Sequence, residues 1–331
     1  MDARLTDEQR ALRETVSRMV AISAVSEVAG LGDEQRAQRL ARDIVNGGLR
    51  DLRDADAGPT GVEVAIVAEQ LSNGVAEASF LGPILAADLC RRAGVRPQKS
   101  TTVALTGDLS RIATGDDLPS AAVFDANGET HALFVTDAAG KFGLGRTAIR
   151  TDGSPVDLSR VVGRPSGGAT EDIPGAVLSA EDLAAWRSFG HAVLSADLLG
   201  AARAAHRATV EYACVRMQYG RAISSFQAVQ HLLAESLILL EGAESAVNYA
   251  AWAADAEPTE SAIDTALAAK LYVAGAARTI CETAIQVHGG IGNTWECMVH
   301  VHLRRVLLAA QVLGDEGALM DELVDRRLRA A

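Results

Sequence analysis

The first part of the chain shows hydrophobic residues at helical spacing. Behind a helix capping box that runs from Thr6 to Gln9, apolar positions fall three or four residues apart, at Leu12, Val16, Met19 and Val20. The same periodicity predicts further helices near residues 33–46, 61–75 and 80–93. Turn-forming pairs lie between or at the ends of these segments, at Gly47-Gly48, Gly58-Pro59 and Gly82-Pro83.

The pattern changes between about Ser100 and Gly175. Short apolar runs replace the helical periodicity, at 103–105, 121–124 and 132–135, and turn residues such as those of 125–128 separate them. This alternation predicts a β domain of roughly 75 residues, which is enough for a small barrel or sandwich.

Long segments of helical periodicity return after a second capping sequence at Ser179. Four of them are predicted, near 180–219, 224–256, 259–288 and 294–328, with breaks at Gly220, at 256–258 and at 289–292. The expected fold is therefore mainly α with a small β domain. We divide it into an N-terminal helical domain at 1–98, a β-rich middle domain at 99–178 and a C-terminal four-helix bundle domain at 179–331.

Composition narrows the possible partners. The 331 residues carry a formal net charge of −12, which argues against binding to the phosphate backbone of nucleic acids, although a few placed arginines can still bind an anionic coenzyme. We find no apolar run near the roughly 20 residues of a membrane span and no signal-peptide core. The four cysteines form no Cys-x-x-Cys pair. We expect a cytoplasmic protein without a metal centre and without a nucleic-acid or membrane partner.

Two sequences in the bundle carry candidate chemistry. In the first, which runs from Tyr212 to Gln227, Arg216 and Arg221 bracket the break at Gly220 and could bind a phosphate group. In the second, from Gln286 to Glu296, three glycines in four positions would let another group approach the backbone, and nearby amides could bind an anion. Taken separately, each is also compatible with an ordinary turn between two helices.

In this order and spacing the two sequences resemble the acyl-CoA dehydrogenase family. That family carries an Arg-x-Gln-Phe-Gly-like motif with a downstream Gln, then a Gln-x-x-Gly-Gly-x-Gly turn, on the same succession of helical, β and helical domains. The resemblance implies that Arg216 binds the pyrophosphate of an FAD in a neighbouring subunit and that Tyr219 packs on this cofactor. It also implies contacts to the FAD from Gln227, Gln286, Gly289 and Gly290, and hence an oligomer.

The catalytic base of the family is missing from the expected places. Members remove the α-proton of an acyl-CoA thioester with a carboxylate while the β-hydride passes to the flavin. Leu313 and Gly190 occupy the two positions where the family places that base, and neither can take a proton. Asp315, Glu316 and His191 lie close by in sequence and are weak candidates.

The middle domain also departs from the family. It is shorter than usual, and the Thr-Glu-Pro-x-x-Gly-Ser-Asp-like stretch that helps to hold the flavin ring is not found; residues 104–108 are a poor substitute. We therefore hypothesise a base-lacking subunit of a heteromeric acyl-CoA dehydrogenase, similar to short members of actinobacterial steroid catabolism. A partner subunit, an acyl-CoA substrate and an electron-transfer flavoprotein are the expected partners. The alternatives are a self-sufficient homo-oligomeric enzyme and a flavin-free scaffold or acyl-CoA-binding protein.

Overall fold

The computed structural model describes residues 4–54, 58, 60–138, 141–151 and 156–330. The predicted turn residue Pro59 lies outside this part of the chain. Four α-helices precede the sheet: α1 (Asp7–Ile22), α2 (Glu34–Asn46), α3 (Gly61–Asn73) and α4 (Leu81–Arg92), with short 3-10 turns η1 (Val28–Gly30) and η2 (Leu49–Arg53). The predicted capping box at Thr6 is confirmed, since its side chain accepts from the Gln9 amide while the Gln9 side chain accepts from the Thr6 amide.

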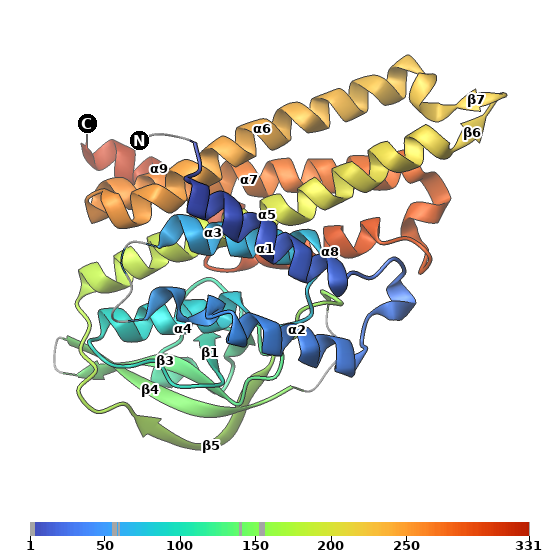
Figure 1. The fold of residues 1–331 in the computed structure, drawn as a ribbon. Coiled ribbons are helices and arrows are strands. Elements are labelled where there is room, and N and C mark those ends of the chain that lie inside the picture. Colours follow the sequence, from blue (N-terminus) through green and yellow to red (C-terminus); the bar gives the residue numbers. More distant parts are fainter. Residues whose placement is uncertain (1–3, 55–57, 59, 139–140, 152–155, 331) are drawn as a thin grey trace.

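The middle region forms a five-stranded sheet in the order β2-β1-β3-β4-β5. Its strands are β1 (Thr101–Leu105), β2 (Ala122–Phe124), β3 (His131–Ala138), β4 (Lys141–Arg150) and β5 (Arg164–Asp172), with the turn η3 (Gly115–Asp117) after β1. Only β1 and β3 are parallel among these pairs; the other neighbours are antiparallel. The sheet lies below the helical layer in Figure 1, with α4 between them. Three predicted apolar runs are confirmed as β1, β2 and β3.

Three long helices dominate the C-terminal region: α5 (Ala180–Val215), α6 (Gln227–Ala256) and α7 (Thr259–His288). Between α5 and α6 lie the short strands β6 (Met217–Gln218) and β7 (Arg221–Ala222) and the turn η4 (Ile223–Ser225). The turn η5 (Gly289–Asn293) follows α7, and α8 (Val299–Gln311) and α9 (Glu316–Ala330) complete the chain. The prediction of one last helix over 294–328 is wrong, because Leu313 has a positive φ of 63° and breaks it in two.

One hydrophobic core joins the three regions. Its largest cluster includes Leu85 of α4, Leu133 of β3 and Val193 of α5. A buried ion network crosses the same regions: Asp197 on α5 accepts from Arg160, which precedes β5, and from Arg305 on α8. These guanidiniums hold the pKa of Asp197 at about 2 against the opposing effect of burial. The helices and the sheet therefore share one interior, and the domain boundaries predicted above remain a prediction.

No helix in the described part of the chain combines the length and the apolar character needed to cross a membrane.

Candidate functional site

The first candidate sequence forms a small β-hairpin at the end of the helical layer. Figure 1 shows β6 and β7 projecting beyond the ends of α5 and α6. The predicted helix end at Gly220 is wrong: α5 ends at Val215, and Arg216 follows in an extended conformation as its C-cap. Tyr219 and Gly220 form the turn between the strands, with φ of 52° and 78°. Two successive positive φ values are typical of a tight type I′ hairpin turn.

The hairpin presents its side chains to solvent. The side chain of Tyr219 is 92% exposed. Its backbone is in the left-handed region, which is unfavourable for a residue with a side chain. Arg221 lies over the ring of Phe226, with its guanidinium carbon 4.2 Å from the ring centroid. Arg216 is exposed, and its guanidinium forms no ion pair with the described residues. Arg221 is exposed as well, so both predicted arginines are accessible to an anionic ligand.

The second candidate sequence follows the end of α7. Gly289 has φ 65° and ψ −143°, a combination open to glycine alone. Gly290 has nothing within 4 Å of the place where a Cβ would stand, whereas a Cβ on Gly292 would lie 3.0 Å from the Cβ of His288. Gly292 thus allows the turn to pack tightly, and the backbone at Gly289 and Gly290 stays open for another group to approach.

The two sequences lie at the same end of the bundle. Tyr212, one helical turn before Arg216, stacks on the ring of His288, which directly precedes Gly289. Gln227, at the start of α6, and Gln286, in the last turn of α7, are both exposed. An exposed arginine, two amide side chains and an open backbone turn are donors that fit an anionic group such as a pyrophosphate.

The two family base positions lie in contact with each other. Leu313 is 2% exposed, and a Cβ built on Gly190 of α5 would be 2.4 Å from its Cδ1 and 3.4 Å from Cδ2 of Leu85. The Leu313 amide also donates to the carbonyl of Leu109 in the middle region, at 2.8 Å. Residues 123 positions apart in sequence, 190 and 313, therefore meet in an apolar, closely packed contact.

The three weak base candidates have other environments. Asp315 is exposed, and its side chain accepts from the Ala318 amide at the start of α9; Glu316 is the exposed first residue of that helix. His191 is completely buried, and neither ring nitrogen has a hydrogen-bond partner among the described residues. Burial, with the nearby charges of Lys270 and Arg187, lowers the pKa of His191 well below its usual value, so the imidazole is neutral.

Lys270 is a buried residue that the sequence did not single out. Its Nζ donates to the carbonyls of Val312 and Gly314, the two residues that flank Leu313. Burial and the charge of Arg187 lower the pKa of Lys270 to about 7, with Asp315 opposing the shift. The sequence feature that could have drawn attention to Lys270 is its position as the one charged residue in the apolar run 266–271.

The stretch 104–108, a poor substitute for the flavin-ring motif, leads into a hydrogen-bonded loop. Asp108 accepts from the Thr106 hydroxyl and from the Ser110 amide and hydroxyl, and these bonds lower the pKa of its carboxyl to about 2. The polar groups of this loop are therefore bonded to one another.

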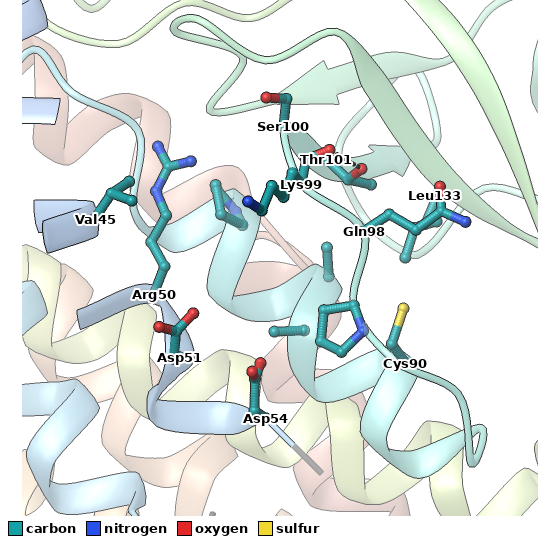
Figure 2. Close-up of a pocket in the computed structure, with 14 residues that line it drawn as sticks. Val45, Arg50, Asp51, Asp54, Cys90, Gln98, Lys99, Ser100, Thr101 and Leu133 are labelled. Atoms are coloured by element: carbon teal, nitrogen blue, oxygen red, sulfur yellow. Dashed lines mark hydrogen bonds between the residues drawn. The ribbon is translucent and has the colours of Figure 1, made fainter. Parts of the chain in front are cut away.

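A separate pocket of about 460 Å³ lies between η2, α4 and the start of β1. In Figure 2, Arg50 and Lys99 lie toward one side of it and Asp51 and Asp54 toward the other. Its wall includes Cys90, whose thiol pKa is raised to about 12 by burial and by the charge of Asp54. Sequence reasoning did not anticipate this pocket, because its lining comes from four separate segments between α2 and β3.

Comparisons with known proteins agree with this architecture. Residues 188–328 match the family model described as "Acyl-CoA dehydrogenase, C-terminal domain". Over 322 residues the chain is 29% identical to acyl-CoA dehydrogenase IpdE2 of Mycobacterium tuberculosis, covering 93% of each chain.

Solved structures of similar fold span the whole chain. The ChsE4-ChsE5 complex from Mycobacterium tuberculosis superposes with a TM-score of 0.80 at 21% identity, covering 100% of both chains. A structure described as the Tcur3481-Tcur3483 steroid ACAD gives 0.82 at 21% identity, covering 98% of both. The family model and the full-length relative show that the chain belongs to the acyl-CoA dehydrogenase family of oxidoreductases.

Proposed function

We propose that this chain is the base-lacking subunit of a heteromeric acyl-CoA dehydrogenase. It contributes Arg216, Tyr219 and Gln286 to an FAD whose reacting ring and catalytic base belong to a partner subunit. The observation that carries the proposal is the apolar contact between Gly190 and Leu313, the two positions where the family places its base.

The chemistry of the family explains why this contact matters. Removal of an α-proton requires a carboxylate within hydrogen-bonding reach of the substrate carbon, while FAD, when bound, accepts the β-hydride. A side chain on Gly190 would overlap Leu313, and Leu313 itself has no group that can take a proton. The buried contact therefore supports a chain that binds cofactor without supplying the base.

The weak candidates are poorly suited to replace it. Asp315 is engaged at the start of α9, and both Asp315 and Glu316 face solvent. His191 is buried, and burial lowers its pKa well below the usual value, which makes it a weak base. A self-sufficient homo-oligomeric enzyme using one of these three residues is the less favoured alternative.

The proposed FAD contacts are supported by the exposure of the side chains that would make them. Arg216, Tyr219 and Gln286 face solvent at one end of the bundle, next to an open glycine turn. Exposed tyrosine on a strained hairpin turn is unfavourable in an isolated subunit, and a partner-bound cofactor would give it a packing surface.

The relatives suggest the substrate class. One similar structure is described as a steroid ACAD and another as a complex of two chains. We therefore propose a steroid-derived acyl-CoA as substrate. The family resemblance adds an electron-transfer flavoprotein as the proposed electron acceptor.

The test begins with the visible spectrum of the chain alone and after purification with its co-purifying dehydrogenase subunit. We expect a colourless chain alone, and a yellow complex whose flavin bleaches with acyl-CoA. Flavin that bleaches in the isolated chain would favour the self-sufficient enzyme, and a complex without flavin would favour the scaffold.

The shared site is tested by substitution within the complex. Arg216→Ala removes the cation proposed for the pyrophosphate and is expected to lower FAD affinity by at least about tenfold. Arg39→Ala, at an exposed position of α2, is the matched control and should leave FAD content unchanged. If Arg216→Ala retains the full FAD content and affinity, the shared-site proposal is wrong.

A further inference from the structure

Tyr212 and His288 join the two halves of the proposed cofactor site. Tyr212 lies in the last turn of α5, four residues before Arg216, and His288 is the last residue of α7, directly before Gly289. Their ring centroids are 4.2 Å apart and their planes differ by 17°, so the rings are stacked. Among the aromatic pairs found in the described residues this separation is the shortest.

His288 is held in place by a contact within α7. Its Nδ1 lies 2.8 Å from the carbonyl of Ala284, and the residue is only 9% exposed. Burial lowers the pKa of the imidazole, so the ring is neutral, and the tautomer with a proton on Nδ1 donates to that carbonyl. The Cβ of His288 also lies close to Gly292, so the histidine packs against the glycine turn.

The hairpin side depends on α5 for its position. Ile223 donates to the carbonyl of Arg216 at 2.8 Å and so closes the hairpin base, but Tyr219 at the tip is exposed. The Tyr212 hydroxyl donates to the His288 carbonyl at 3.5 Å, a long contact that adds little to the stacking. The stacked rings therefore join the last turn of α5 directly to the residue that precedes the glycine turn.

We propose that Tyr212 and His288 are a positioning pair that sets the spacing between Arg216 and the backbone of Gly289 and Gly290. Neither ring needs to touch the cofactor. The pair keeps the guanidinium and the open amides at the separation at which both can bind one pyrophosphate. This inference rests on the shared FAD site proposed above, and it assigns a role to two residues that the candidate base and cofactor contacts leave unused.

Two substitutions of one residue separate stacking from bulk. Tyr212→Phe keeps the ring and removes the hydroxyl, whereas Tyr212→Leu keeps an apolar side chain and removes the ring. FAD affinity is measured by titrating the flavin-depleted complex with FAD well below its melting temperature. We expect Tyr212→Leu to weaken FAD binding by about two- to tenfold, the range typical of an aromatic pair, and Tyr212→Phe to leave it unchanged.

A double substitution tests whether the pair acts through Arg216. In an Arg216→Ala background, Tyr212→Leu should weaken FAD binding further by less than about twofold, because the group that it positions is gone. A loss of affinity from Tyr212→Leu that is just as large without Arg216 would overturn the positioning role.

Other outcomes are equally decisive. If Arg216→Ala weakens FAD binding and Tyr212→Leu does not, the positioning pair is wrong while the shared site stands. Equal losses in Tyr212→Phe and Tyr212→Leu would assign the effect to the hydroxyl and reject stacking. If Arg216→Ala has no effect, the shared site fails and the pair fails with it. Should Tyr212→Leu not fold, His288→Leu compared with His288→Phe makes the same test from the other ring.

Discussion

Gly190 lies on α5 where the helix has no room for a side chain. Leu313 fills that space from the turn between α8 and α9, and Leu85 closes it from α4. Glycine inside a helix normally costs stability, so its presence here is explained by the approach of Leu313 rather than by the helix itself. Gly275 of α7 is also a glycine inside a helix, but a Cβ built on it would have nothing within 4 Å.

These two glycines give a matched pair of substitutions. Gly190→Ala should destabilise the protein by about 1–3 kcal/mol through overpacking, whereas Gly275→Ala should be neutral or stabilise it by up to about 1 kcal/mol. Urea denaturation of each variant measures the difference. In a Leu313→Ala background the cost of Gly190→Ala should fall. If the two glycine substitutions have equal effects, the packing account of Gly190 is incorrect.

At the scale of elements, the turn between α8 and α9 is held from two sides. On one side, the Leu313 amide donates a hydrogen bond to the Leu109 carbonyl of the middle region. On the other side, Nζ of Lys270 on α7 donates to the carbonyls of the two residues that flank Leu313. Leu109 and Leu313 both have positive φ, of 65° and 63°. Left-handed backbone at two leucines is unfavourable locally, so the surrounding contacts must impose it.

Lys270→Met is the test of that restraint. Two buried carbonyls would lose their donor, and we expect a loss of at least about 2 kcal/mol in the free energy of unfolding, although removal of a buried charge opposes it. Hydrogen exchange of the Leu313 amide should become faster. Lys141→Met, at an exposed position of β4, serves as the control. Unchanged stability and unchanged exchange in Lys270→Met would show that the turn holds without the lysine.

At the scale of the whole molecule, buried polar groups link regions far apart in sequence. Asp197 of α5 joins Arg160 and Arg305, and the Arg305 guanidinium also donates to the Ser159 hydroxyl. Neutral histidines are buried in the same interior: His302 on α8 is 5% exposed, and burial with the charges of Arg305, Arg207 and His300 lowers its pKa to about 3.

This histidine predicts sensitivity to mild acid. The pKa of His302 in the folded protein lies below the value of 6.5 for an unperturbed histidine, so the unfolded chain takes up the proton first as the pH falls. The neutral, buried His302 therefore stabilises the folded protein fully above pH 6.5, and this stabilisation is lost as the pH falls from 6.5 toward about 3. Between pH 7 and pH 5 the free energy of unfolding should fall by about 2 kcal/mol. Urea denaturation at both values should show a smaller loss in His302→Gln. Equal losses would exclude His302 as the cause.

The sequence by itself determined the element types and their order. Helical periodicity and capping residues are local properties, so α1 to α7 and the first three strands could be read from the chain within a few residues. The two motifs and the absence of a carboxylate at positions 190 and 313 were also visible as residue identities.

Only the tertiary structure decided how these residues meet. The hairpin after Arg216 depends on left-handed backbone at Tyr219, and the break after α8 depends on left-handed backbone at Leu313. The hydrophobic pattern of a sequence does not indicate where a residue with a side chain adopts a positive φ. The contact of Gly190 with Leu313, the stacking of Tyr212 on His288 and the bonds of Lys270 join elements distant in sequence. Such contacts follow from packing of the whole chain, because a local pattern fixes which face a residue occupies and leaves its partner undetermined.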